Sequence, residues 1–238
     1  MFLEFNLLLS FCFILTRNEF LRSVSLSVYI RVPEALSFQD AARLIQKETP
    51  NEYLDAVKKS GKLLYRGETS ASSCFRLEPE PDLLLPGTYP ESDAVMYFQG
   101  LEDCLTASNA SVRSSKTNSR FIVRPSVGHI ATSSLSDAAL WGSPVSVWPL
   151  GTALSYAFPK SRSQFFDSSV YLSSCAYPKL HTSFCIDDIY VDTDLTHALV
   201  SKREVMFATL DKMGRESSAF VAVPARYDHK LRRSLGLL

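Results

Sequence analysis

The spacing of apolar and polar positions predicts helices in the first half of the chain and many short strands in the second. Phe38, Ala41 and Ile45 recur at helical spacing behind Ser37, a residue type that caps helices. Pro50 ends that helix, and Gly61 provides the exit of the next one. The predicted helices cover residues 38–46, 51–60, 91–105, 135–141 and 225–235.

Strands are predicted wherever short runs are apolar or alternate between apolar and polar residues. They cover residues 62–66, 121–124, 127–131, 145–148, 152–158, 170–172, 185–191, 203–210 and 219–223, with 25–32 as a strand or an extended lead-in. The stretch 106–120 has few apolar residues, which favours a surface loop. Helices first and strands later exclude a regular doubly wound sheet and predict a mixed α+β fold.

Composition limits the domain count and the classes of partner. The chain has 238 residues, of which 46% are apolar, enough for one domain with a real core. We expect a single domain over residues 28–238, preceded by an extension over 1–27. The formal net charge is zero, so it favours long-range attraction neither to nucleic acid nor to an acidic membrane, and no such partner is obvious.

The amino-terminal extension contains an apolar run over residues 7–16, preceded by Glu4 and Asn6 and by no basic residue. The run is too short to span a bilayer and lacks the charged start of a secretory signal. Three interpretations stay open: a weak signal peptide, a membrane-associating segment, and sequence upstream of the true coding start, which we favour. Only secretion would make the sequon at Asn109 usable.

The cysteines favour a reducing compartment such as the cytoplasm. Their number is odd, and their spacing does not fit a disulfide framework. The five are Cys12, Cys74, Cys104, Cys175 and Cys185. Two of these lie near His181, with Asp187 or Asp188 as a further ligand, but the spacing fits no standard zinc site, so no metal is predicted.

Fingerprints of several common enzyme classes are absent: the chain has no GxGxxG, GxxxxGK[ST], HExxH or GxSxG. Three other stretches carry candidate chemistry: 63–67 (LLYRG), 132–136 (TSSLS) and 203–207 (REVMF). The arginine of the first offers a charged planar fork for phosphate, and the glycine after it allows close backbone approach. A fixed carboxylate in the third would stabilise an oxocarbenium-like centre.

In this order the three stretches resemble the Arg, Ser-Thr-Ser and Glu motifs of the ADP-ribosyltransferase superfamily, in its toxin-like mono-ADP-ribosyltransferase branch. The resemblance implies a split antiparallel β core of two small sheets, with helices mainly from the amino-terminal half. It also implies a reaction in which NAD⁺ and an acceptor, expected to be a protein, give ADP-ribosylated acceptor and nicotinamide. Neither a metal nor a further cofactor is implied.

The same resemblance assigns roles to individual residues. Arg66, with Tyr65 and Gly67, would hold the phosphate and ribose portion of NAD⁺. The hydroxyls of Thr132, Ser133 and Ser134 would order the pocket and the catalytic carboxylate. Glu204 would bind the nicotinamide ribose and stabilise positive charge as nicotinamide leaves.

Two departures from the family pattern affect these assignments. Thr132 replaces the first serine, and a register one residue earlier would put Ala131 there, while a plain helix cap explains such hydroxyls equally well. Lys202 stands two residues before Glu204, where many members have Glu or Gln that engages the acceptor. A charged lysine cannot accept a hydrogen bond, so arginine is not the expected acceptor.

The stretch 190–201 would be the acceptor-recognition loop by the same resemblance, with Asp192, Asp194 and His197 as contacts, although solvated loop residues would look the same. Other notable residues are assigned to core or surface: the aromatics Trp141, Trp148, Phe165 and Phe166, and the basic tail Arg226, Lys230, Arg232 and Arg233. His129 near the hydroxyl cluster does not establish a hydrolase triad.

Two other classes of function stay open. A protein that kept the fold but lost turnover, serving as a binding or virion-type structural protein, would also explain Lys202. A thiol hydrolase would use Cys175 or Cys185 with His181 and would ignore NAD⁺.

Overall fold

The computed structural model describes residues 34–69, 72–77, 83–84, 94–113, 121–161, 163–165 and 189–238. The chain divides into two units, Met1–Val32 and Pro33–Leu238, and every described residue belongs to the second. The predicted extension at 1–27, the lead-in at 25–32 and the strand at 170–172 therefore lie outside the described residues.

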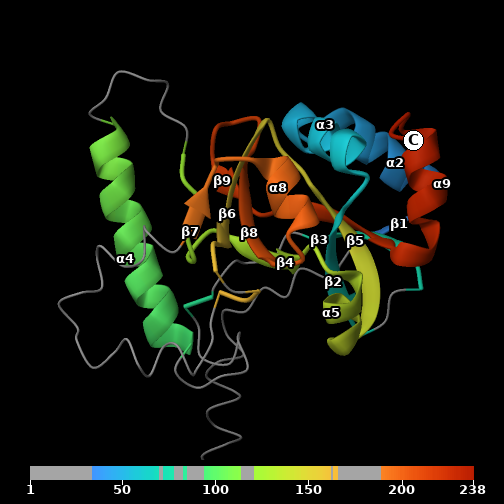
Figure 1. The fold of residues 1–238 in the computed structure, drawn as a ribbon. Coiled ribbons are helices and arrows are strands. Elements are labelled where there is room, and N and C mark those ends of the chain that lie inside the picture. The colour runs from blue at the N-terminus through green and yellow to red at the C-terminus, as the bar shows by residue number, and fades with distance from the viewer. Residues whose placement is uncertain are drawn as a thin grey trace, which may run out of the picture. The chain divides into compact units, whose positions relative to one another are not determined.

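The described unit is mixed α+β, as the sequence predicts (Figure 1). Its helices are α2 (Phe38–Glu48), α3 (Asn51–Ser60), α4 (Ala94–Arg113), α5 (Leu135–Leu140), α8 (Leu195–Val200) and α9 (Asp228–Ser234), with the 3₁₀ turn η2 (Ala225–Tyr227). Its strands are β1 (Glu34–Leu36), β2 (Leu64–Glu68), β3 (Cys74–Leu77), β4 (His129–Thr132), β5 (Ser143–Pro149), β6 (Ala153–Pro159), β7 (Ile189–Val191), β8 (Glu204–Leu210), β9 (Glu216–Ser217) and β10 (Phe220–Pro224).

The described strands pair in the order β1-β3-β10-β5-β2-β4-β8-β6-β7, with β9 beside β8, and every pair is antiparallel. Two small sheets were expected, whereas these strands form one hydrogen-bonded path. The link between β2 and β4 is a single residue pair, Tyr65 with Thr132. The sheet therefore consists of two halves that meet at one narrow junction.

The two halves also pack against each other through aromatic rings. Phe220 on β10 belongs to one half, and Phe207 on β8 belongs to the other; their ring centroids lie 6.2 Å apart. Both rings are fully buried. The junction thus folds one half-sheet toward the other, which buries the apolar side chains between them.

The first two helices follow local sequence signals closely. Ser37 caps α2, its hydroxyl accepting a hydrogen bond from the Asp40 amide at 3.1 Å. Gly61 ends α3 in the left-handed conformation, with φ of 63°. A side chain there would be strained, so the glycine is the reason the chain can turn directly into β2.

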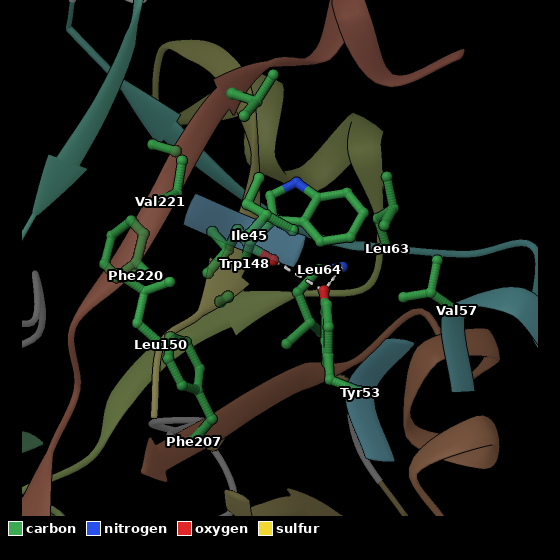
Figure 2. Packing of buried hydrophobic residues seen from close by; sticks show 14 of the residues in the cluster. Ile45, Tyr53, Val57, Leu63, Leu64, Trp148, Leu150, Phe207, Phe220 and Val221 are labelled. Carbon is green, nitrogen blue, oxygen red and sulfur yellow. Dashed lines mark hydrogen bonds between the residues drawn. The ribbon is translucent and has the colours of Figure 1, made fainter. Parts of the chain in front are cut away.

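These helices cover a core in which Tyr53 is the central polar group (Figure 2). Its hydroxyl donates to the Val147 carbonyl at 2.8 Å and accepts from the Leu64 amide at 3.2 Å. Burial raises the pKa of this phenol, so it stays protonated and able to donate. One side chain from α3 thereby ties β2 and β5 together inside the core.

A second apolar cluster lies on the other face of β8. Val205 and Phe207 belong to the cluster under α2 and α3, whereas Met206 and Ala208 belong to the second one, as alternation along a strand requires. The second cluster includes the four α4 positions that predicted this helix: Ala94, Phe98, Leu101 and Leu105. Opposite faces of the same strand thus support α3 and α4.

The structure corrects two predictions near α4. Residues 106–113, expected in a loop, are helical, because a helix started by a strongly apolar segment extends cheaply through weaker helix formers. Residues 121–124, expected as a strand, have no strand pairing although Phe121, Ile122 and Val123 are buried. The Val123 amide instead donates to the Ser155 hydroxyl at 2.9 Å.

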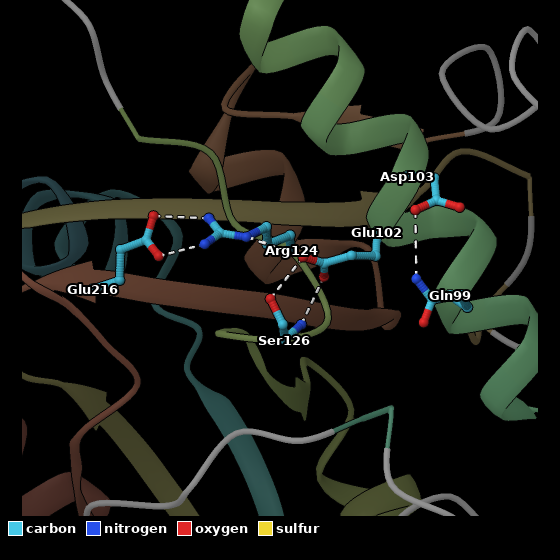
Figure 3. Close-up of polar contacts among 6 residues, drawn as sticks. All are labelled: Gln99, Glu102, Asp103, Arg124, Ser126 and Glu216. Atoms are coloured by element: carbon cyan, nitrogen blue, oxygen red, sulfur yellow. Dashed lines mark hydrogen bonds and ion pairs between the residues drawn. The ribbon is translucent and has the colours of Figure 1, made fainter.

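A polar cluster around Arg124 fixes α4 to this segment and to β9 (Figure 3). The Arg124 guanidinium binds both Glu216 oxygens, at 2.8 and 2.7 Å, and its Nε lies 3.1 Å from Glu102 of α4. Glu102 also accepts from the Ser126 amide at 2.8 Å and from its hydroxyl at 2.7 Å.

In the part of the chain that is described, no helix is long and apolar enough to cross a bilayer.

Candidate functional site

The sheet brings the three predicted stretches onto neighbouring strands. Arg66 lies on β2, the hydroxyl cluster ends β4, and Glu204 begins β8, and these strands are adjacent in the order β2-β4-β8. Thr132 is the shared partner, since it pairs with Tyr65 on one side and with Glu204 on the other. Segments separated by more than 60 residues thus converge at the narrow junction of the sheet.

Strand alternation divides the candidate residues between two faces. Directly paired residues project to the same side, so Tyr65, Thr132 and Glu204 share one face. Arg66 and Ala131 are their chain neighbours and project to the other. The face of Arg66 therefore carries Ala131 and not the hydroxyl of Thr132.

Arg66 is held by two side chains on its own face. Its Nε lies 2.8 Å from Oε1 of Glu68, and its Nη1 contacts Nε2 of His129. Glu68 follows Arg66 by two residues, the strand spacing that puts both on one side. The Arg66 side chain remains 36% exposed, so its fork is anchored but still reaches solvent.

The surroundings of His129 disfavour its protonated form. Burial, reinforced by the positive charge of Arg66, holds the pKa of this imidazole well below its ordinary value. Its ring packs against two aromatic rings, with centroids 5.1 Å from Phe220 and 5.8 Å from Phe207. Sequence reasoning set His129 aside, because its partners come from β2, β8 and β10.

The hydroxyl cluster is engaged mainly in local structure. Ser134 caps α5, its hydroxyl accepting from the Asp137 amide at 3.3 Å and lying 2.9 Å from the Ser136 hydroxyl. Thr132 Oγ1 accepts from the Ser134 amide at 3.0 Å. Helix capping, one of the two interpretations from the sequence, thus describes what Ser134 does here.

Ser133 joins the end of β4 to the start of β8. Its amide donates to the Arg203 carbonyl at 2.9 Å, and its hydroxyl accepts from the Arg203 amide at 3.0 Å. Arg203 in turn donates to the Pro159 carbonyl at 2.7 Å. The backbone immediately before Glu204 is therefore fixed from two sides.

Glu204 is oriented by the short segment 163–165. Its Oε2 accepts from the Phe165 amide at 2.8 Å, and its own amide donates to the Ser163 carbonyl at 2.6 Å. Phe165 is fully buried in the cluster under α4. The Phe165 amide thus holds the carboxylate of Glu204, a contact that the sequence patterns did not predict.

Lys202 adopts a left-handed backbone, with φ of 55°, just after the end of α8. This is the position at which helices usually end in glycine. The side chain is exposed, so Lys202 presents a cation two residues from Glu204. Lys202 therefore has a structural role in ending the helix.

The prediction of a loop at 190–201 is wrong, because this stretch contains the helix α8. Asp194 caps this helix, accepting from the Thr196 and His197 amides at 2.9 and 3.3 Å. Asp192 accepts from the Ser155 hydroxyl at 3.0 Å and the Tyr156 amide at 2.8 Å. His197 packs against the rings of Phe158 and Tyr190. Each of the three has a structural task.

Gly67 lets α5 approach β2 closely. A Cβ at this position would lie 2.4 Å from the Ala138 carbonyl oxygen and 2.6 Å from the Trp141 carbonyl carbon. Trp141 itself is 59% exposed, while Trp148 and Phe165 are buried as expected. The glycine after Arg66 is therefore explained by helix packing, whether or not a ligand also approaches it.

Other predicted residues are placed in part. Cys74 and Cys104 are buried thiols, and Arg226 and Arg232 donate to the carbonyls of Ser72 and Gly61. Within the described ranges no three His, Cys, Asp or Glu side chains gather as a metal site requires. The remaining cysteines, His181, Asp187, Asp188 and Phe166 lie outside the described residues.

Comparisons with family models, with curated proteins and with solved structures find no match to this chain. Any function is therefore inferred from the residues and their geometry.

Proposed function

We propose that this chain is a NAD⁺-dependent mono-ADP-ribosyltransferase that cleaves the bond between nicotinamide and ribose. The observation that carries the proposal is the pairing of Thr132 with both Tyr65 and Glu204, which brings three distant motif stretches to one junction. Chance resemblance of short stretches does not require their strands to be neighbours.

The proposed roles follow from the chemistry of each group. Arg66 is a partly exposed side chain whose guanidinium contacts His129 and Glu68, suited to the diphosphate of NAD⁺. Glu204 is a carboxylate held by the Phe165 amide, suited to stabilising positive charge on the nicotinamide ribose. Arg66 and Glu204 project to opposite faces of the sheet, so an extended dinucleotide must reach around the narrow junction to contact both groups.

A specific set of observations favours a second candidate, a protein that binds NAD⁺ or ADP-ribose without turnover. Ala131, not a hydroxyl, shares the face of Arg66, and the hydroxyls of Ser133 and Ser134 are engaged in backbone contacts. Lys202 puts a cation where many members of the family have Glu or Gln. In this alternative the Arg66 contacts serve binding alone.

The deciding experiment measures nicotinamide release from NAD⁺ by the purified protein and by Glu204→Gln. We expect release by the wild type and a loss of about 100-fold or more in the variant, because a preorganised charge is removed from the transition state. Glutamine keeps an oxygen that can accept from the Phe165 amide, so the thermal unfolding midpoint should stay unchanged.

The matched control is Glu34→Gln, which neutralises an exposed carboxylate on the edge strand β1 and should leave the rate unchanged. Equal release by Glu204→Gln and the wild type would refute the role of Glu204. Tight ADP-ribose binding without any nicotinamide release would instead select the second candidate.

A further inference from the structure

His129 is positioned by packing from both halves of the sheet. Its ring contacts Phe207 of β8 and Phe220 of β10, at centroid distances of 5.8 and 5.1 Å. Both phenylalanines are fully buried, so neither ring has room to move away. The position of the imidazole is thus fixed before any ligand binds.

Only one assignment of donor and acceptor is possible for the contact between His129 and Arg66. A guanidinium donates hydrogen bonds and cannot accept them, so Nε2 of His129 must present its lone pair to Nη1 of Arg66. The proton of the neutral ring is then on Nδ1. A charged imidazolium would have no lone pair to offer and would repel the arginine.

Glu68 is the second side chain that contacts the guanidinium of Arg66. Its Oε1 forms an ion pair with Nε at 2.8 Å, while His129 contacts Nη1, so two edges of the planar group face a partner. Among the described residues, no hydrogen bond or ion pair joins Nη2 to a side chain, and the Arg66 side chain is 36% exposed. Part of the donor fork is therefore held by side chains while the group still reaches solvent.

We propose that His129 is a positioning residue that holds the Arg66 guanidinium ready for the diphosphate of a nucleotide ligand. The inference rests on the proposed function for the identity of the ligand, but the orientation of Arg66 by His129 is testable by itself. Preordering a long side chain removes the entropy that would otherwise be lost when the ligand binds.

The test compares His129→Phe with His129→Gln. Phenylalanine keeps a ring packed against Phe207 and Phe220 but offers no acceptor, whereas glutamine restores an acceptor without the ring. Phe207→Leu is the matched control, because it loosens the same packing and leaves the acceptor in place. Two quantities are measured: the Nε–Hε signal of Arg66 in ¹⁵N NMR, assigned by its loss in Arg66→Lys, and the affinity for ADP-ribose.

We expect a sharp Arg66 signal in the wild type and in His129→Gln, and a broadened one in His129→Phe. ADP-ribose affinity should fall about tenfold in His129→Phe and return to within about threefold in His129→Gln, the range expected for ordering one long side chain. If nicotinamide is released, the KM should rise while kcat changes less.

An Arg66 signal that stays sharp in His129→Phe, or broadens equally in Phe207→Leu, would overturn the positioning role. A wild type that binds no ADP-ribose would refute the proposed function, and the NMR comparison would still decide whether His129 orients Arg66.

Discussion

Asp228 shows how a single side chain can make stability depend on pH. It begins α9, where its carboxyl lies near Ser146, Tyr65 and Arg232. Burial outweighs these favourable contacts and raises the pKa of Asp228 to about 6. One of its oxygens, Oδ1, is buried without a hydrogen-bond partner, in keeping with a costly ionised form.

The expected consequence is a loss of stability as pH rises. A carboxyl whose pKa is higher when folded binds its proton more tightly in the folded state, so the free energy of unfolding falls between pH 3.8 and about 6. The penalty is then constant at higher pH. Asp228→Asn should remove this decline and gain about 1–2 kcal/mol at pH 7, after allowance for solvent screening.

Urea unfolding of Asp228→Asn and the wild type at several pH values from 4 to 8 measures this difference. Asp103→Asn, on the exposed face of α4, serves as the control and should follow the wild type. Parallel curves for Asp228→Asn and the wild type would show that the carboxyl is not desolvated.

Most individual contacts at the candidate site could not be predicted from the sequence, because they join residues that are far apart. The Arg66 to His129 contact spans 63 positions, and that of Phe165 with Glu204 spans 39. Arg66 and Glu68 are an exception, since strand spacing alone puts them on one face. The resemblance to a family supplied the candidate residues, and the strand order supplied their arrangement.

At the scale of elements, the approach of α5 to β2 depends on one missing side chain. Gly67→Ala would push a methyl group into the Ala138 and Trp141 backbone, which cannot yield as a flexible side chain would. We expect a loss of about 1–3 kcal/mol in the free energy of unfolding. The fluorescence of Trp141, the exposed tryptophan of the two, should shift as α5 moves.

The comparison for this experiment is Gly214→Ala. Gly214 has φ of +74° and no atom within 4 Å of an added Cβ, so it adds backbone strain without a clash. It should cost about 1 kcal/mol and leave the tryptophan fluorescence unchanged. Unchanged fluorescence in Gly67→Ala would argue against close packing of α5 on β2.

Elements with strong local signals were the ones that the sequence predicted well. Ser37 and Gly61 mark the start of α2 and the end of α3, since capping depends on neighbouring residues alone. The helix α8 was missed although Asp194 caps it and Leu195, Ala198 and Leu199 are buried at helical spacing. The family resemblance favoured a loop there, and that expectation masked a clear helical pattern.

At the scale of the whole molecule, the Arg124 cluster determines how firmly α4 is attached. Its three charged side chains are 15–28% exposed, so the ion pairs are screened less than surface pairs. Both glutamates hold the pKa of Arg124 above its ordinary value. The cluster joins α4, the segment after it and β9, which is 92 positions away along the chain.

Arg124→Met should therefore destabilise the protein by about 2 kcal/mol, since it leaves two partly buried carboxylates without their partner. Arg215→Met is the control, because this 72% exposed arginine pairs with Asp211 at the surface and should cost less than about 1 kcal/mol. Hydrogen exchange should localise the effect of Arg124→Met to α4. Similar losses in the two variants would mean that the cluster adds nothing beyond an ordinary surface ion pair.

The single pair between Tyr65 and Thr132 has a mechanical consequence. β6 and β8 share five residue pairs and β2 and β5 share five, whereas the backbones of β2 and β4 meet at one. A force that pulls the strands apart would meet the fewest backbone hydrogen bonds between β2 and β4, so these two strands would separate first. Such a separation would part Arg66 from Glu204 while each half of the sheet stayed intact.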